Sequence, residues 1–88
     1  MNNQYSHEEL FISLIKQFQQ SVLIYLGKEK NPQNSKYEKN IATAEYFIAM
    51  LKMLQNKTKN NLNNKEAEKI NQIVNQLDSY YITETGND

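Results

Sequence analysis

Cysteine is absent from the chain's 88 residues, which excludes disulfides, thiolate metal ligands and thiol nucleophiles. A small hydrophobic core therefore has no covalent support. A chain of this length forms one domain and buries roughly 60–65% of the surface of its unfolded state, so its margin of stability is thin. Burial against a second copy of the chain is the remaining route to further stability.

Arginine is absent as well, and the chain has one histidine and two glycines. Two glycines are too few for a glycine-rich phosphate loop. His7 has no carboxylate and nucleophile placed to act with it, and Glu66 and Glu68 face apart on a helix because they differ by two positions. No set of carboxylates has the metal-ligand spacing of a di-iron bundle. We therefore expect a protein that is not an enzyme and that binds no metal or cofactor.

Long apolar runs are also missing, since none reaches the roughly 18–20 residues that cross a bilayer. Residues 1–5 lack the charged-then-apolar pattern of a signal peptide. Lys16 is the only cation of the first predicted helix, which does not fit an interfacial anchor. We expect no membrane contact and a cytoplasmic location.

Residues 6–26 have the pattern of a helix with marked ends. Ser6 and Glu9 match a capping box, and Gly27 suits the left-handed residue that follows a helix. A spacing of about 100° per residue gathers seven apolar residues on one face: Phe11, Leu14, Ile15, Phe18, Val22, Tyr25 and Leu26. Four more flank it: Leu10, Ile12, Leu23 and Ile24. This helix is apolar over more of its surface than one neighbour needs.

Residues 28–39 form the connection to the next helix, which Asn40 caps. Pro32 keeps Asn31 out of the helical region, and Asn34-Ser35 indicates a turn. The connection is long for two helices, so we expect it to be functional or mobile.

The helix predicted over residues 41–58 is apolar over roughly 220° of its circumference. Nine residues make up this arc: Ile41, Ala44, Tyr46, Phe47, Ile48, Met50, Leu51, Met53 and Leu54. A short polar stripe opposes it: Glu45, Ala49, Lys52 and Asn56. An arc this wide predicts a central helix packed on two sides. We expect the other helices to cover one side and another chain to cover the second.

A third helix is predicted over residues 63–82. Asn60 or Asn61 suits a left-handed exit from the second helix, and Asn63 with Glu66 marks the new start. One face of this helix is apolar: Ile70, Ile73, Val74, Leu77, Tyr80 and Tyr81. The fold class is thus all-α, a three-helix bundle (about 6–26, 41–58 and 63–82) in one domain of residues 6–82. Residues 1–5 and 83–88 are predicted to be a flexible N-terminus and a flexible polar tail.

Charge is unevenly distributed along the chain. Residues 28–65 carry eight lysines and three glutamates, whereas residues 66–88 carry one lysine and five acidic residues. We interpret the two segments as facing each other within the fold or between subunits. The alternative is a dedicated binding patch that steers a partner.

Two lysine-rich corners are candidates for a partner or phosphate site. The first contains Lys28, Lys30, Lys36 and Lys39 with Tyr37, and the second contains Lys57 and Lys59. Lysines with an interleaved aromatic can hold phosphates and stack a base. Three observations argue against nucleic-acid binding: the absence of arginine, the net charge of zero and the lack of a known nucleic-acid-binding motif. Weak RNA or DNA binding is kept as the alternative function.

Self-association is the favoured function. Tyr46, Met50 and Met53 are the main candidates, because methionine packs adaptably on partner-binding surfaces. Leu23 and Ile24 are candidates on the first helix. We predict a non-catalytic interaction or scaffold module that forms a homodimer, the commonest closed oligomer. An unidentified protein partner is left open.

One bacterial family has a similar pattern. It is carried by Leu26-Gly27, Asn31-Pro32, Ala44 and Leu77 to Tyr81, and above all by the segment 48–62, with Met50-Leu51-x-Met53-Leu54-x-x-Lys57-Thr58-Lys59-x-Asn61-Leu62. Over roughly residues 10–82 the chain resembles the domain-of-unknown-function family numbered eighteen-forty-four.

The resemblance implies a short, all-helical cytoplasmic protein and implies no activity, cofactor or partner. The chain departs from the family pattern at Ala49, Asn60 and Asp78, where aspartate, glycine and arginine are usual. A function that depended on an aspartate–arginine pair would not carry over to this chain.

Overall fold

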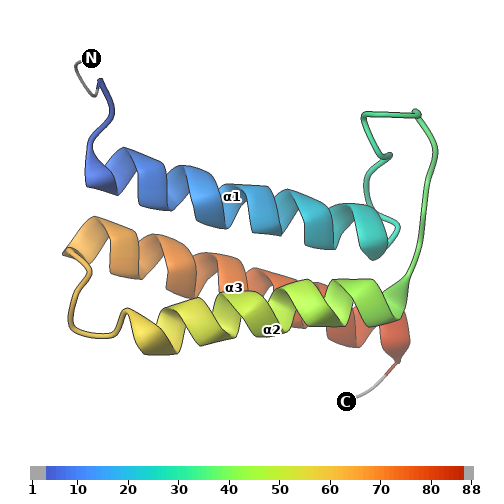
Figure 1. The fold of residues 1–88 in the computed structure, drawn as a ribbon. Helices are drawn as coiled ribbons and strands as arrows, with labels where there is room; N and C mark the ends of the chain where they lie inside the picture. The colour runs from blue at the N-terminus through green and yellow to red at the C-terminus, as the bar shows by residue number, and fades with distance from the viewer. Residues whose placement is uncertain (1–3, 87–88) are drawn as a thin grey trace.

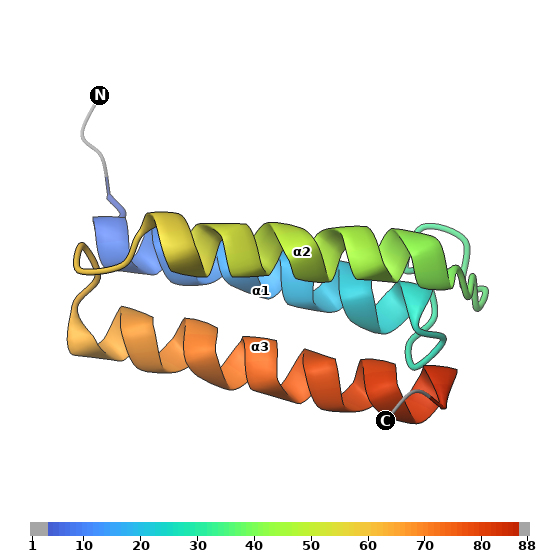
Figure 2. The ribbon, with the colours of Figure 1, turned by 90° about the horizontal axis from the view of Figure 1, so that it is seen from below.

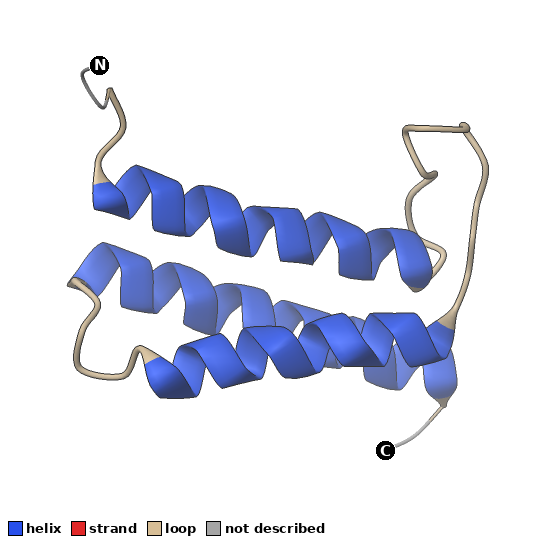
Figure 3. Ribbon diagram, viewed as in Figure 1, coloured by secondary structure: helices blue, strands red, loops and turns tan. Residues whose placement is uncertain are grey.

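The computed structural model describes residues 4–86, which form three helices: α1 (His7–Tyr25), α2 (Ile41–Lys57) and α3 (Asn64–Thr85) (Figure 1). α1 and α3 run in the same direction, and α2 runs in the opposite direction (Figures 1 and 2). Each helix contacts the other two. The described residues contain no strand, only an isolated bridge between Asn31 and Lys36 (Figure 3). The predicted all-α three-helix bundle is confirmed.

The helix starts are capped as the sequence predicts. The Glu9 amide donates to Ser6 Oγ at 3.1 Å and the Ser6 amide donates to Glu9 Oε1 at 3.3 Å. Asn63 and Glu66 exchange the same pair of bonds at 2.8 and 2.9 Å. Asn40 Oδ1 accepts from the third amide of α2 at 3.1 Å. These bonds satisfy amides that have no partner within a helix, so each start is fixed locally.

The residues that turn the chain after α1 and after α2 have left-handed backbones. Gly27 has φ of 83° and Asn60 has φ of 73°. Glycine reaches this region without steric cost and asparagine tolerates it. Of the two asparagines considered for the exit from α2, Asn60 is therefore the one that turns the chain.

The connection between α1 and α2 is held by its own hydrogen bonds. Asn31 Oδ1 accepts from the Gln33 amide at 2.9 Å, and Asn34 Oδ1 accepts from the Lys36 amide at 3.0 Å. Ser35, with φ of 59°, completes the turn predicted at this place. The asparagine side chains thus replace regular secondary structure in this segment.

α3 is longer than predicted, which corrects the assignment of residues 83–88 as a tail. The hydroxyls of Thr83 and Thr85 donate to carbonyls one turn back, at 3.1 and 2.8 Å. Gly86, with φ of 69°, ends the helix as a left-handed cap. The hydrophobic periodicity stops before these polar residues, so it predicts too early an end for the helix. Gly86 sets the actual C-terminal end of α3. The rest of this predicted tail, residues 87–88, and residues 1–3 of the predicted N-terminus lie outside the described residues.

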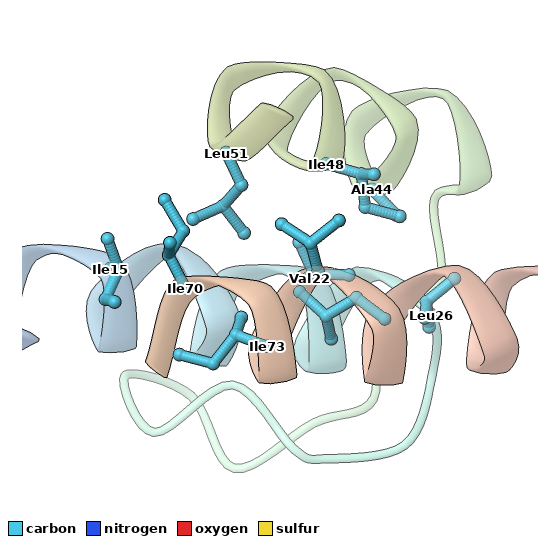
Figure 4. Packing of buried hydrophobic residues seen from close by; sticks show 10 residues of the cluster. Ile15, Val22, Leu26, Ala44, Ile48, Leu51, Ile70 and Ile73 are labelled. Carbon is cyan, nitrogen blue, oxygen red and sulfur yellow. The ribbon is translucent and has the colours of Figure 1, made fainter. Parts of the chain in front are cut away.

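The core lies between the three helices. It consists of Ile15, Val22, Leu26, Ala44, Ile48, Leu51, Ile70, Ile73, Val74 and Leu77. Figure 4 shows Ile48 and Leu51 pointing from α2 toward α1 and α3. On α1 the buried line is centred on Ile15 and Val22, whereas Leu14, predicted on the same face, remains 40% exposed. The predicted face was centred too far toward Leu14, because α1 must serve two neighbours.

Leu51→Ala tests the core. Leu51 is fully buried, so its truncation leaves a cavity and is expected to lower the free energy of unfolding by about 2–5 kcal/mol. Urea denaturation followed by circular dichroism measures this loss. Ile82→Ala, at a largely exposed side chain, is the control and should lose less than half as much. Equal losses would contradict the central position of Leu51.

Candidate functional site

One side of α2 is occupied by polar contacts to α3. Lys52 Nζ lies 3.0 Å from Asp78 Oδ1, and the Tyr81 hydroxyl donates to Glu45 Oε2 at 2.6 Å. The bond from Tyr81 to Glu45 raises the pKa of Tyr81, with burial and the carboxylate charge adding to it. Glu45 and Lys52 belong to the polar stripe of the sequence pattern, so this stripe faces the rim of α3.

The opposite side of α2 contacts α1 through aromatic rings. The Phe47 ring lies 5.9 Å from the Phe18 ring and 6.1 Å from the Tyr25 ring, between centroids. All three rings are half-buried and pack against the core. Two sides of α2 are therefore covered by the chain itself.

The remaining side of α2 is apolar and exposed. Tyr46 is 62% exposed and Met53 is 44% exposed, and Met50 between them is half-buried. Helical spacing places Tyr46 and Met53 opposite the buried line of Ala44 and Leu51. We call Tyr46, Met50 and Met53 the outer face of α2. Its side chains are not fully shielded by their own polypeptide, which is the condition that self-association requires.

Two leucines of α1 extend this apolar surface. Leu10 is 47% exposed and Leu14 is 40% exposed. They lie one and two turns before Phe18, on the side of α1 that reaches α2 through Phe47. The outer face of α2 together with Leu10 and Leu14 is named the α1–α2 apolar surface below.

Leu23 and Ile24, the self-association candidates predicted on the first helix, lie outside the α1–α2 apolar surface. Leu23 is half-buried and packs against the core, and Ile24 is only 8% exposed. The far end of the connection returns to the last turn of α1, where the Tyr25 carbonyl accepts from the Asn40 amide at 2.8 Å. Helix periodicity does not reveal that a loop returns over the helix it has just left.

The lysines of the first corner gather at one end of the bundle. Lys28 Nζ lies 4.7 Å above the Tyr80 ring and Lys30 Nζ lies 5.7 Å above the Tyr37 ring, to the centroids. Lys36 belongs to the same connection, and Tyr37 is 61% exposed. The Tyr80 contact was not anticipated, because it joins residues far apart in sequence.

The second lysine corner is separate from the first. Lys57 ends α2 and Lys59 follows it, whereas the first corner precedes the start of α2. The 17 residues of α2 at about 1.5 Å per residue put about 25 Å between the two corners. The structure therefore does not bring the two corners together into one patch.

Two ion pairs join the basic segment 28–65 to the acidic segment 66–88. They are Lys52 with Asp78 and Lys39 with Glu84, the latter at 2.9 Å. The hydrogen bond and charge of Lys39 hold the pKa of Glu84 below its usual range, and the charge of Lys28 adds to this. For these pairs the interpretation that the two segments face each other within the fold is confirmed.

Two of the three departures from the family pattern, Ala49 and Asp78, meet in space. Ala49 and Asp78 line one shallow hollow of about 280 Å³ between α2 and α3, together with Lys52. Lys52 lies one turn after Ala49 and pairs with Asp78. The chain thus has an ion pair across this seam with the signs reversed from the aspartate–arginine pattern.

The described residues offer little for ligand or metal chemistry. One hollow of about 700 Å³ between α1 and α3 has charged residues of both signs along its walls, and Ile12 is its one apolar lining residue. Within residues 4–86 no group of three histidine, cysteine or acidic side chains could hold a metal ion. No described helix combines the length and apolarity needed to span a bilayer.

Lys39→Met tests the pair that joins the connection to α3. Loss of the lysine should raise the pKa of Glu84 toward its ordinary value, measured by a carboxyl NMR titration. Because the folded pKa is lowered, the pair stabilises the fold above the ordinary glutamate pKa of about 4.3 and this stabilisation is lost as pH falls through the folded pKa. Lys36→Met is the control and should leave Glu84 unchanged. An unchanged Glu84 in Lys39→Met would contradict the pairing.

Comparison with known proteins gives a family and no function. The model of a family described as Domain of unknown function (DUF1844) matches residues 8–83. No curated protein and no solved structure gives a match. The family match covers nearly all of α1, the whole of α2 and all of α3 up to Thr83. The chain therefore belongs to the DUF1844 family.

Proposed function

We propose that this protein is a non-catalytic interaction or scaffold module that self-associates as a homodimer through the α1–α2 apolar surface, in the cytoplasm. One observation supports this most directly: Tyr46 and Met53 are exposed on α2 while its polar residues Glu45 and Lys52 are used against α3. A helix that served only its own bundle would turn its polar stripe outward.

The energetics favour covering this surface. Apolar area removed from water contributes about 25 cal/mol per Å², and Leu10, Leu14, Tyr46 and Met53 are exposed apolar side chains on two helices that pack together. Single exposed apolar residues are ordinary on a protein surface, but contiguous ones mark interaction sites. Methionine adapts its shape to a partner, and tyrosine offers a large apolar area at low entropic cost.

Met53→Lys tests the proposal. A lysine on this surface places a charge where the partner must be dry, so the dimer dissociation constant should rise at least about tenfold, which is about 1.4 kcal/mol. Sedimentation equilibrium over a wide concentration range measures the change. Helicity should be retained, because Met53 lies outside the core cluster.

Ser79→Lys is the matched control, since Ser79 is exposed on α3 away from the α1–α2 apolar surface. It should leave the dimer intact. A wild-type protein that stays monomeric at high concentration would remove the proposal.

The alternative function is weak binding of single-stranded RNA or DNA at the first lysine corner. The observation in its favour is the exposed Tyr37 ring beside Lys30, an arrangement that can stack a base next to a phosphate contact. Glu29, Glu38 and the Glu84 partner of Lys39 lie among these lysines and oppose it.

A titration with single-stranded RNA tests the alternative. Binding through phosphates must weaken steeply as salt rises, and Lys30→Glu should abolish it while Lys59→Glu at the other end of α2 should not. No binding at low salt would eliminate this alternative and would leave the self-association proposal unaffected.

A further inference from the structure

The outer face of α2 is a regular stripe. Tyr46, Met50, Met53 and Lys57 follow one another at intervals of four, three and four residues, and Thr43 precedes them by three. This alternation keeps side chains in line along a helix, and it is the spacing by which two helices pack lengthwise. The stripe is nearly symmetric about Met50, with an exposed large side chain, Tyr46 or Met53, on either side.

We infer that two copies of the chain pair α2 against α2 in antiparallel orientation, about a two-fold axis that passes close to Ala49 and Met50. This inference rests on the proposed self-association and specifies its geometry. In it, Tyr46 of each copy lies against Met53 of the partner subunit, and the two Met50 side chains meet near the axis.

Charge selects the antiparallel orientation over the parallel one. Lys57 is exposed at the C-terminal end of the stripe, so a parallel pair in register would set Lys57 against Lys57 of the partner subunit. Like charges directly opposed across an interface are unfavourable. The antiparallel pair sets Lys57 beside the neutral residues Ala42 and Thr43 and also opposes the two helix dipoles.

Side-chain shape points the same way. A parallel pair would place two Tyr46 rings side by side, whereas the antiparallel pair places each ring against a methionine thioether, a favourable contact. Ala42 and Ala49 are exposed and lie seven residues apart beside the stripe. Their small side chains allow two α2 helices to approach closely along their length.

The leucines of α1 enlarge this contact. α1 and α2 are antiparallel (Figure 2), so Leu10 and Leu14 lie beside the half of α2 that contains Met53. In the antiparallel dimer they therefore border Tyr46 of the partner subunit. A stable interface covers about 800 Å² of each partner, and one helix stripe needs these flanking residues to approach that area.

The absence of cysteine makes cross-linking a direct test, because any introduced thiol is the only one in the chain. Positions 46 and 53 face each other in the antiparallel dimer, whereas two copies of position 46 are about 10 Å apart along the axis at 1.5 Å per residue. A disulfide needs Cα atoms within about 7 Å, so a mixture of Tyr46→Cys and Met53→Cys should give at least about tenfold more cross-linked dimer than either variant alone.

Two further variants complete the experiment. Met50→Cys lies near the axis and should cross-link to itself, which reports contact through the outer face of α2 in either orientation. Ser79→Cys on α3 is the control and should not cross-link. Circular dichroism of each variant verifies the helical fold.

The outcomes separate the geometry from the proposed function. Efficient self-cross-linking of Tyr46→Cys would overturn the antiparallel inference and leave self-association standing. A wild-type dimer whose α2 variants never cross-link would overturn the inference by placing the interface elsewhere. A monomeric wild type would overturn both proposals.

Discussion

The rotation of α2 about its own axis is the constraint on which the rest of the structure depends. Ala44, Ile48 and Leu51 must face the space between α1 and α3, because this is the line along which α2 contributes to the core. Once that line is fixed, helical spacing determines the direction in which every other residue of α2 faces. Glu45 is turned toward α3, Phe47 toward α1, and Tyr46 toward solvent.

Core burial, and not the polar contacts, sets this rotation. Lys52 and Asp78 form an ion pair whose side chains are largely exposed, and such pairs contribute about 0–1 kcal/mol. Full burial of one leucine or isoleucine contributes about 1.5–3 kcal/mol. Lys52 and Glu45 therefore find partners on α3 because the core has already placed them there. Their contribution is to leave few polar groups on the sector of α2 that faces away from α3.

Local signals in the sequence predicted the three helix starts and the exits from α1 and α2, because caps such as Ser6, Asn63 and Gly27 act through their immediate neighbours. Tertiary features were predicted less well. Periodicity defines an apolar arc but not how neighbours divide it, so it does not separate the exposed Leu14 from the buried Ile15 and Val22 on the same predicted face. The return of the connection to the Tyr25 carbonyl through the Asn40 amide, and the pairing of Lys39 with Glu84, depend on contacts that no short window of sequence contains.

The structure divides the wide apolar arc of α2 into three parts with different surroundings. One part is buried in the core, a second contacts α1 through Phe47, and the third, at Tyr46 and Met53, is exposed. The side chains of this third part lie opposite the buried line, and the Tyr46 ring makes an edge contact with the Phe47 ring at 5.7 Å between centroids. Exposed apolar area lowers solubility unless a partner covers it. The proposed dimer assigns a role to the only part of the arc that the described chain leaves uncovered, and it does so with residues whose replacement should spare the bundle.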